Sequence, residues 1–115
     1  MNINLLIEKC IKSAIDYGNS AFEVVEKPRK TNRLYDICFK NFKELKRIDT
    51  NELEKLLDHP NDYVKFKSAI HFLSVNEEKA KEVLKPLARK PDLFGFSTEI
   101  LLSEWDEGNL KDYLK

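Results

Sequence analysis

The sequence lacks most of the features that identify an enzyme, a membrane protein or a nucleic-acid binder. Its 115 residues include only three glycines, and they form no glycine-rich phosphate loop or Gly-x-Ser-x-Gly turn. No apolar run approaches the roughly 20 residues that a membrane helix needs. Basic and acidic residues both number 20, so the basic excess typical of nucleic-acid binders is missing. We therefore expect that the protein is not an enzyme.

Cysteine and histidine are also scarce. Cys10 and Cys38 both lie among apolar residues, as buried free thiols in a reducing cytoplasm do. His59 precedes Pro60 in a turn, and His71 has no Cys, Asp or Glu three or four residues away. Neither arrangement encodes a metal site. The N-terminal stretch also lacks the basic start of a signal peptide, so we expect a cytoplasmic protein with no metal and no cofactor.

Helical periodicity is abundant. Apolar residues recur every three or four positions over 3–17, which predicts an amphipathic helix that ends at Gly18. A short helix is predicted over 19–26, before a proline, and a longer one from about residue 31 to 47 with a basic outer face. These N-terminal helices together span residues 1–48.

The rest of the sequence predicts two consecutive helix pairs, 49–75 and 76–108. In the first pair, Asp49 or Thr50 caps a short helix, and Asn61 or Asp62 caps the longer helix that follows. In the second pair a helix begins at Asn76, and Pro86 predicts a kink or an early end in it. The stretch "PDLFGF" is predicted to be a turn, and the last helix to end near Gly108. Stacked pairs of this kind predict an all-α fold with a single domain, 1–115.

The helix in "YVKFKSAIHFL" is apolar over more than one stripe, which predicts an inner helix packed on several sides. Lys67, His71 and Ser74 are spaced i, i+4 and i+7, so they are predicted to form its one solvent-exposed polar stripe. In the next unit, Glu99, Ser103 and Asp106 have the same spacing, and Trp105 is predicted to anchor the core. The predicted partner-binding set is Lys67, His71, Ser74, Glu99, Ser103, Glu104, Asp106 and Glu107.

Residues spread over the whole chain follow one recognisable pattern. The second half contributes Asn61, Asp62, Val64, Lys65, Ser68, Ala69, Glu77, Glu78, Ala80, Leu102, Trp105, Gly108 and Leu110, and the first half Ala14, Gly18, Asn32, Tyr35 and Asp36. In this pattern the chain resembles a bacterial family of small HEAT-like proteins catalogued as a domain of unknown function. Lys65 stands where that family usually has arginine, so a planar two-pronged donor becomes a single point charge.

The resemblance implies a HEAT-like α-α superhelix of stacked antiparallel helix pairs, with no established catalysis. Some HEAT-like proteins of this size resemble immunity proteins, which bind and neutralise a cognate bacterial toxin. We therefore expect a non-catalytic protein-binding module, with an immunity protein as the leading hypothesis. The alternative is a HEAT-like adaptor or regulatory protein. An enzyme similar to the HEAT-like DNA glycosylases is disfavoured, because a neutral chain of this length lacks their basic surface.

Charge is unevenly distributed along the chain. Residues 27–47 carry a net charge of +6, most simply a solvated face, whereas residues 92–112 carry −5. The acidic residues near the C-terminus would suit the basic cleft of a nuclease toxin. We expect a protein partner such as a toxin domain, with no direct nucleic acid and no membrane, and a monomer or a weak dimer.

Overall fold

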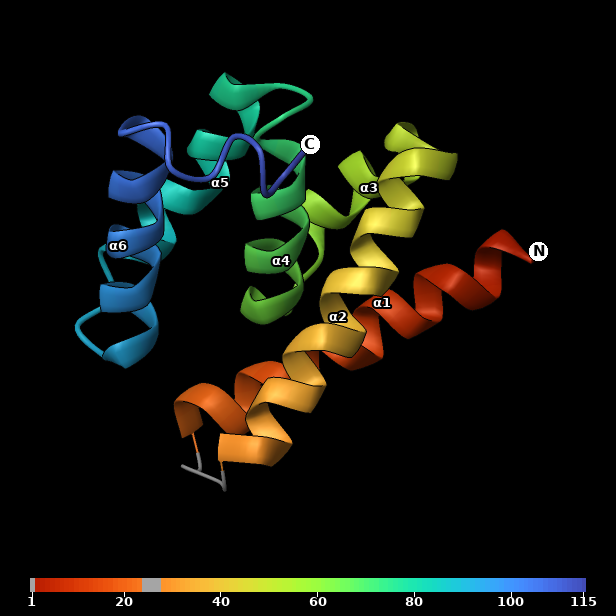
Figure 1. Cartoon of the computed structure of the whole chain (residues 1–115), viewed down its shortest axis with the longest axis horizontal. Coiled ribbons are helices and arrows are strands. Elements are labelled where there is room, and N and C mark those ends of the chain that lie inside the picture. The colour runs from red at the N-terminus through yellow and green to blue at the C-terminus, as the bar shows by residue number, and fades with distance from the viewer. Residues whose placement is uncertain (1, 24–27) are drawn as a thin grey trace.

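The structure, a computed structural model, describes residues 2–23 and 28–115. Within those residues the fold is all-helical and has no strand, as the sequence predicts. The α-helices are α1 (Ile3–Gly18), α2 (Pro28–Ile48), α3 (Thr50–Lys55), α4 (Asp62–Phe72), α5 (Glu77–Ala88) and α6 (Leu93–Asp106), with a π-helical turn η1 (Asn19–Glu23) and a 3-10 turn η2 (Leu56–Asp58) (Figure 1). None of the described helices is long and apolar enough to cross a membrane.

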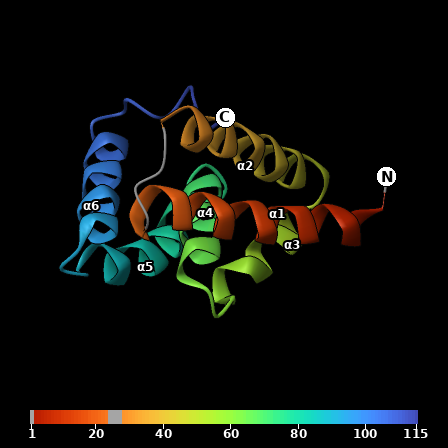
Figure 2. The ribbon, with the colours of Figure 1, turned by 90° about the horizontal axis from the view of Figure 1, so that it is seen from below.

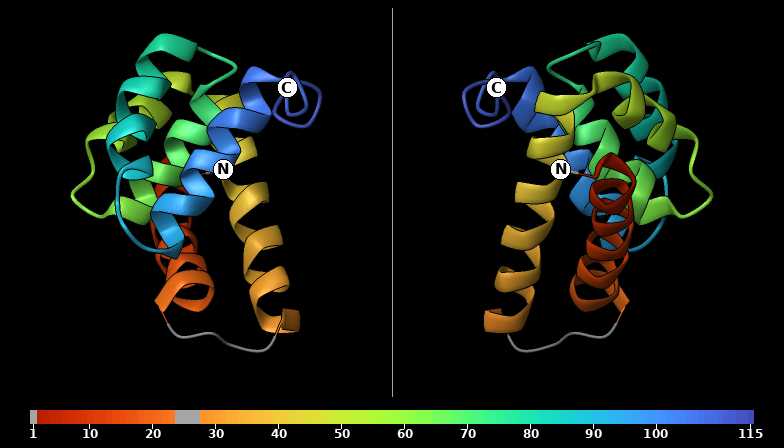
Figure 3. Two further views of the ribbon diagram at one scale, coloured as in Figure 1. Left: turned by 90° about the vertical axis from the view of Figure 1, so that its left-hand side faces the viewer. Right: turned by 90° about the vertical axis from the view of Figure 1, so that its right-hand side faces the viewer.

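Helix α4 lies at the centre of a compact globule that measures 37 × 31 × 27 Å. It contacts α1, α2, α3 and α5, and α5 in turn packs against α6 (Figure 1). Helices α1 and α2 lie side by side and cover α4 on the side away from α5 (Figure 3). Beyond α6, the C-terminal segment 107–115 runs back towards α2 (Figure 2). The predicted inner helix is confirmed, because eight of the eleven residues of α4 are buried.

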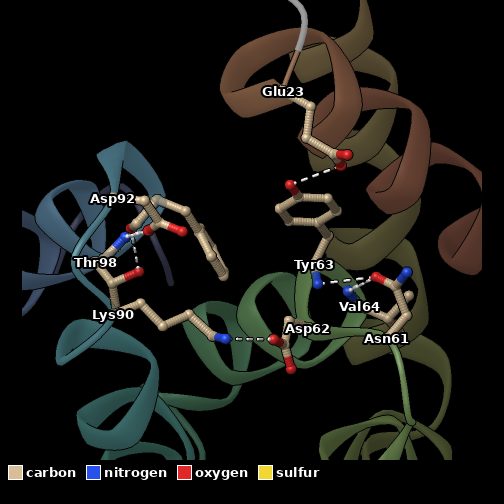
Figure 4. Close-up of polar contacts among 10 residues, drawn as sticks. Glu23, Asn61, Asp62, Tyr63, Val64, Lys90, Asp92 and Thr98 are labelled. Carbon is tan, nitrogen blue, oxygen red and sulfur yellow. Dashed lines mark hydrogen bonds and ion pairs between the residues drawn. The ribbon is translucent and has the colours of Figure 1, made fainter.

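Side-chain caps fix the helix starts largely as the sequence predicts. Asp49 caps α3 and Asn61 caps α4, where its Oδ1 accepts from the backbone N–H groups of Tyr63 and Val64 at 2.9 and 3.3 Å (Figure 4). Asn76 caps α5. The polar oxygen of each cap satisfies backbone donors that have no partner within the helix.

Helix α6 begins earlier than predicted. The prediction of a turn over "PDLFGF" is wrong from Leu93 onwards, because the Asp92 carboxylate caps the helix by accepting from Gly95 N–H at 2.9 Å. A Cβ at Gly95 would lie 1.9 Å from the Lys90 carbonyl oxygen, so only glycine allows the two backbones to approach this closely. Lys90 also forms an ion pair with Asp62, with 3.1 Å between Nζ and Oδ2, which ties this turn to α4 (Figure 4).

Gly18 ends α1 as predicted, but not as a left-handed cap. Among the described residues only Gly108 has a positive φ, at 85°. The chain continues from Gly18 directly into η1. The rest of the predicted short helix, residues 24–26, lies outside the described residues. A Cβ at Gly18 would lie 2.2 Å from Cγ of Tyr63, so glycine is needed here to admit the Tyr63 ring of α4. The Tyr63 hydroxyl then donates to Glu23 Oε2 at 2.8 Å (Figure 4).

Pro86 stands in the last turn of α5, and the helix continues past it to Ala88. The prediction of an early end at Pro86 is therefore wrong. The missing N–H of Pro86 removes the α-helical bond to the carbonyl of Glu82, and both residues are exposed, so water can satisfy that carbonyl. The cost of the proline is small at this exposed helix end.

Candidate functional site

Two residues of the predicted surface stripe lie inside the protein. The side chains of Lys67 and His71 are only 6% and 2% exposed, and only Ser74 is open to solvent. The prediction that all three form an exposed stripe is therefore wrong. Its physical reason is that α1 and α2 pack over this face of α4 and cover it with aromatic rings.

The ammonium of Lys67 is surrounded by aromatic faces. Its Nζ lies 4.1 Å from the ring centroid of Tyr17 on α1, 4.5 Å from that of Tyr35 on α2, and 5.6 Å from that of Phe66. These distances are those of cation–π contacts. Among residues 2–23 and 28–115, no carboxylate forms an ion pair with Lys67 and no side chain or carbonyl hydrogen-bonds its ammonium. The buried cation therefore has rings for neighbours and no described counter-ion.

Burial shifts the ionisation of this cluster. Loss of hydration lowers the pKa of Lys67 from 10.5 to about 8, and the nearby Cys38 thiol opposes that shift. Burial likewise raises the pKa of the Cys38 thiol, and Lys67 counteracts it. At neutral pH the ammonium is still the major form of Lys67, beside a neutral thiol.

His71 is a neutral imidazole at the same site. Burial, followed by the positive charges of Lys67, Lys46 and Lys43, lowers the pKa of His71 to about 3. Its ring stacks on Phe42 with centroids 5.7 Å apart and lies 5.1 Å from the Phe39 ring. No described residue hydrogen-bonds the ring nitrogens, so one donor and one acceptor are available to a small molecule.

Lys67 and His71 line a cavity of about 250 Å³. Apart from Ser97, the walls are aromatic and aliphatic side chains from four helices, from η1 and from the C-terminal segment. They are Tyr17, Phe22, Tyr35, Phe39, Phe66, Ile70, Ser97, Leu101, Leu110, Tyr113 and Leu114. Residues far apart in the sequence thus enclose one apolar space that contains a single cation.

The C-terminal segment forms one wall of this cavity and is tied to α2. Lys46 Nζ donates to the Leu114 carbonyl oxygen at 2.5 Å and to Ser74 Oγ at 3.0 Å. The hydroxyl groups of Tyr35 and Tyr113 also hydrogen-bond to each other. The Leu114 side chain is 2% exposed, so the segment packs on the core and is not a free tail.

The other predicted site residues lie on α6 and just after it, and none of them lines the cavity that contains Lys67 and His71. Glu99, Ser103, Asp106 and Glu107 are exposed, as predicted, and Glu104 is partly exposed. Asp106 Oδ1 pairs with Lys81 Nζ at 2.6 Å, and Glu104 Oε2 accepts from Asn109 Nδ2 at 2.8 Å. The structure therefore does not unite the predicted set into one site.

The outer face of α6 also carries an apolar stripe that the sequence interpretation missed. Leu93, Phe96 and Ile100 are 52%, 57% and 47% exposed and are spaced i, i+3 and i+7. This spacing places them on one side of the helix, and Ser103 and Glu107 continue that side towards its C-terminal end. The opposite side of α6 is buried and includes Trp105, whose Nε1 donates to Glu77 Oε1 at 2.9 Å. The prediction that Trp105 anchors the core is confirmed.

The remaining candidates for chemistry have structural roles or none. Cys10 and Cys38 are free and buried, as predicted. His59 Nδ1 accepts from the Asn61 backbone N–H at 3.0 Å, which makes it a turn residue, again as predicted. In the part of the chain that the structure describes, no three His, Cys, Asp or Glu side chains are grouped so that they could hold a metal ion.

Comparisons of the chain with protein-family models, with curated proteins and with solved structures find no match. The resemblance to the HEAT-like family stays a prediction. Function has to be inferred from the two features described above, the outer face of α6 and the cavity around Lys67.

Proposed function

We propose that the protein is a non-catalytic protein-binding module and that the outer face of α6 is its contact surface. The observation that carries this proposal is the stripe of Leu93, Phe96 and Ile100. Single exposed apolar side chains are common on protein surfaces and need no explanation. Three large ones aligned on one helix face form a continuous apolar patch, and such patches mark interaction sites.

The partner's chemistry follows from the residues around the stripe. Glu99, Glu104 and Glu107 lie beside it or at its end, and residues 92–112 carry a net charge of −5. A complementary partner has an apolar centre with lysine or arginine at its rim, and the opposite charges speed its association. A toxin domain with a basic nucleic-acid cleft has this character, so the proposal includes an immunity protein acting in the cytoplasm. An adaptor for an unrelated basic partner is the alternative.

The proposed architecture is a pair of HEAT-like repeats preceded by N-terminal helices. Two observations support this arrangement. Residues 49–75 contain α3 and α4 and residues 76–108 contain α5 and α6, while α4 packs against α5 and α5 packs against α6. Among the described residues, α6 packs against α5 on its inner side, and Phe96 and Ile100 on its outer side are exposed.

The test compares two double variants, each of which replaces two large exposed apolar side chains by serine. Phe96→Ser with Ile100→Ser removes the stripe, and Leu5→Ser with Ile48→Ser removes exposed apolar side chains outside α6. The gene neighbourhood is searched for a toxin domain, any such domain is co-expressed with each protein, and survival and complex formation are measured. We expect only the α6 variant to lose the complex and the protection. Equal binding by both variants would refute the assignment of α6, and failure of the unaltered protein to protect would refute the immunity role.

Charge is tested separately from the apolar stripe. Glu99→Lys with Glu107→Lys reverses two rim charges that form no ion pair among the described residues, and it leaves the stripe intact. We expect the variant to associate with the partner more slowly than the unaltered protein, with little change in the dissociation rate. At high salt the two association rates should become equal. Unchanged association kinetics would remove the acidic rim from the interface.

A further inference from the structure

We propose that the cavity around Lys67 binds a small organic anion, a carboxylate carried on a single ring or a compact hydrocarbon body. This site is separate from the outer face of α6 and does not depend on the protein-binding role. It is defined by a 94% buried lysine that points into an apolar cavity of about 250 Å³ and has no described counter-ion.

An anionic ligand would supply the counter-ion that the Lys67 ammonium lacks among the described residues. An ammonium has three N–H donors, and a buried cation without a hydrogen-bonded partner is destabilised by the loss of its hydration. The rings of Tyr17, Tyr35 and Phe66 offset only part of that penalty. A carboxylate supplies both the opposite charge and the acceptor oxygens. The neutral His71 ring lines the same cavity and offers a second N–H donor.

The walls specify the rest of the ligand. Phe22, Phe39 and Leu101 offer apolar surface, which a strongly hydrated inorganic anion cannot use. A cavity of about 150 Å³ already accepts benzene. The cavity of about 250 Å³ therefore has room for one ring and a carboxylate.

Other ligand classes fit the cavity poorly. A cationic ligand would meet the ammonium of Lys67, which already occupies the faces of Tyr17 and Tyr35. A metal ion would meet the same repulsion and would find no carboxylate among the described wall residues. A neutral aromatic molecule would fill the space but would leave the ammonium without an acceptor.

The test uses three probes of nearly the same shape that differ in charge: benzoate, benzamide and benzamidinium. Calorimetry on the full chain at neutral pH should show benzoate binding at least about tenfold more tightly than benzamide, with benzamidinium not binding. In amide-resolved NMR spectra, the largest chemical-shift changes on addition of benzoate should occur at Tyr17, Tyr35, Phe39 and His71. Absence of benzoate binding, or equal affinity for benzoate and benzamide, would overturn the proposal without recourse to any variant.

Two variants then test whether the Lys67 ammonium is the cation that binds benzoate. Lys67→Met removes the buried ammonium and keeps an unbranched side chain, and it should lose the preference for benzoate over benzamide. Lys65→Met removes a cation from the same helix at a partly exposed position outside the cavity, and it should retain the preference. If both variants kept it, or both lost it, benzoate would not be held by Lys67.

Discussion

Replacing Lys67 by methionine should make the protein more stable at neutral pH, contrary to the usual effect of a core substitution. Methionine has a similar length and flexibility, so it fills the same space among Tyr17, Tyr35 and Phe66. The change removes a buried cation that no described carboxylate compensates. Replacement of buried charged groups by apolar ones of similar volume is often neutral or stabilising.

The magnitude follows from the ionisation of Lys67. A fall in its pKa from 10.5 to about 8 corresponds to about 3 kcal/mol of destabilisation of the charged form, at about 1.4 kcal/mol per pKa unit. The cation–π contacts with the two tyrosines offset about 2 kcal/mol of this penalty, because the ammonium is desolvated, and methionine loses them. We therefore expect Lys67→Met to raise the free energy of unfolding by about 1 kcal/mol.

The effect also has a defined pH dependence. Because the pKa of Lys67 is lower in the folded protein than in the unfolded chain, its penalty is fully present below about pH 8. The penalty disappears as the pH rises towards 10.5, where the unfolded lysine loses its proton as well. The pKa values of Cys10 and Tyr35, which burial raises, affect stability in the same alkaline range. Both proteins carry these two residues, so their effect largely cancels in the difference.

Urea unfolding followed by circular dichroism measures this difference at neutral pH and near pH 10. The control is Lys65→Met, at a partly exposed position of α4, for which we expect a change within about 0.5 kcal/mol at either pH. A Lys67→Met protein that is less stable at neutral pH would refute the reasoning. So would a stabilisation that stays constant up to pH 10.

Two further substitutions test the packing that builds the cavity. Gly18→Ala places a methyl group against the Tyr63 ring, 2.2 Å from its Cγ, and should lower the free energy of unfolding by about 1–3 kcal/mol in thermal or urea denaturation. Recovery of that stability in the double variant with Tyr63→Leu is expected, and an unaffected single variant would contradict this contact. Leu114→Ala should cost about 2 kcal/mol and speed amide exchange in residues 107–115, because Leu114 is the buried anchor of that segment. Lys111→Ala, at an exposed position of the same segment, serves as its control for stability, and equal effects would show that Leu114 is no anchor.

Much of the fold could be predicted from the sequence because its determinants are local. Asp49, Asn61 and Asn76 are polar caps before apolar periodic stretches, and each caps the helix expected of it. The even apolarity of α4 also predicted burial on several sides. The start of α6 was missed because Gly95 resembles a turn residue, whereas its role depends on a close approach to the Lys90 backbone.

The candidate cavity could not be predicted in the same way. Spacing within α4 groups Lys67, His71 and Ser74 correctly, but it cannot tell whether a neighbouring helix covers the group. The cover comes from aromatic residues of α1 and α2, such as Tyr17 and Tyr35, which are distant in sequence. The one available signal was that a helix packed on several sides has little surface left for a lysine.

The most direct test of the account is the pKa of the Lys67 ammonium, measured by NMR titration of its side-chain carbon and nitrogen signals. Without ligand we predict a value of about 8. With benzoate present we predict a higher value, because a bound carboxylate favours the charged form. A pKa near 10.5 in the free protein, or a pKa that benzoate leaves unchanged, would contradict the assignment of Lys67 as a buried cation that binds an anion.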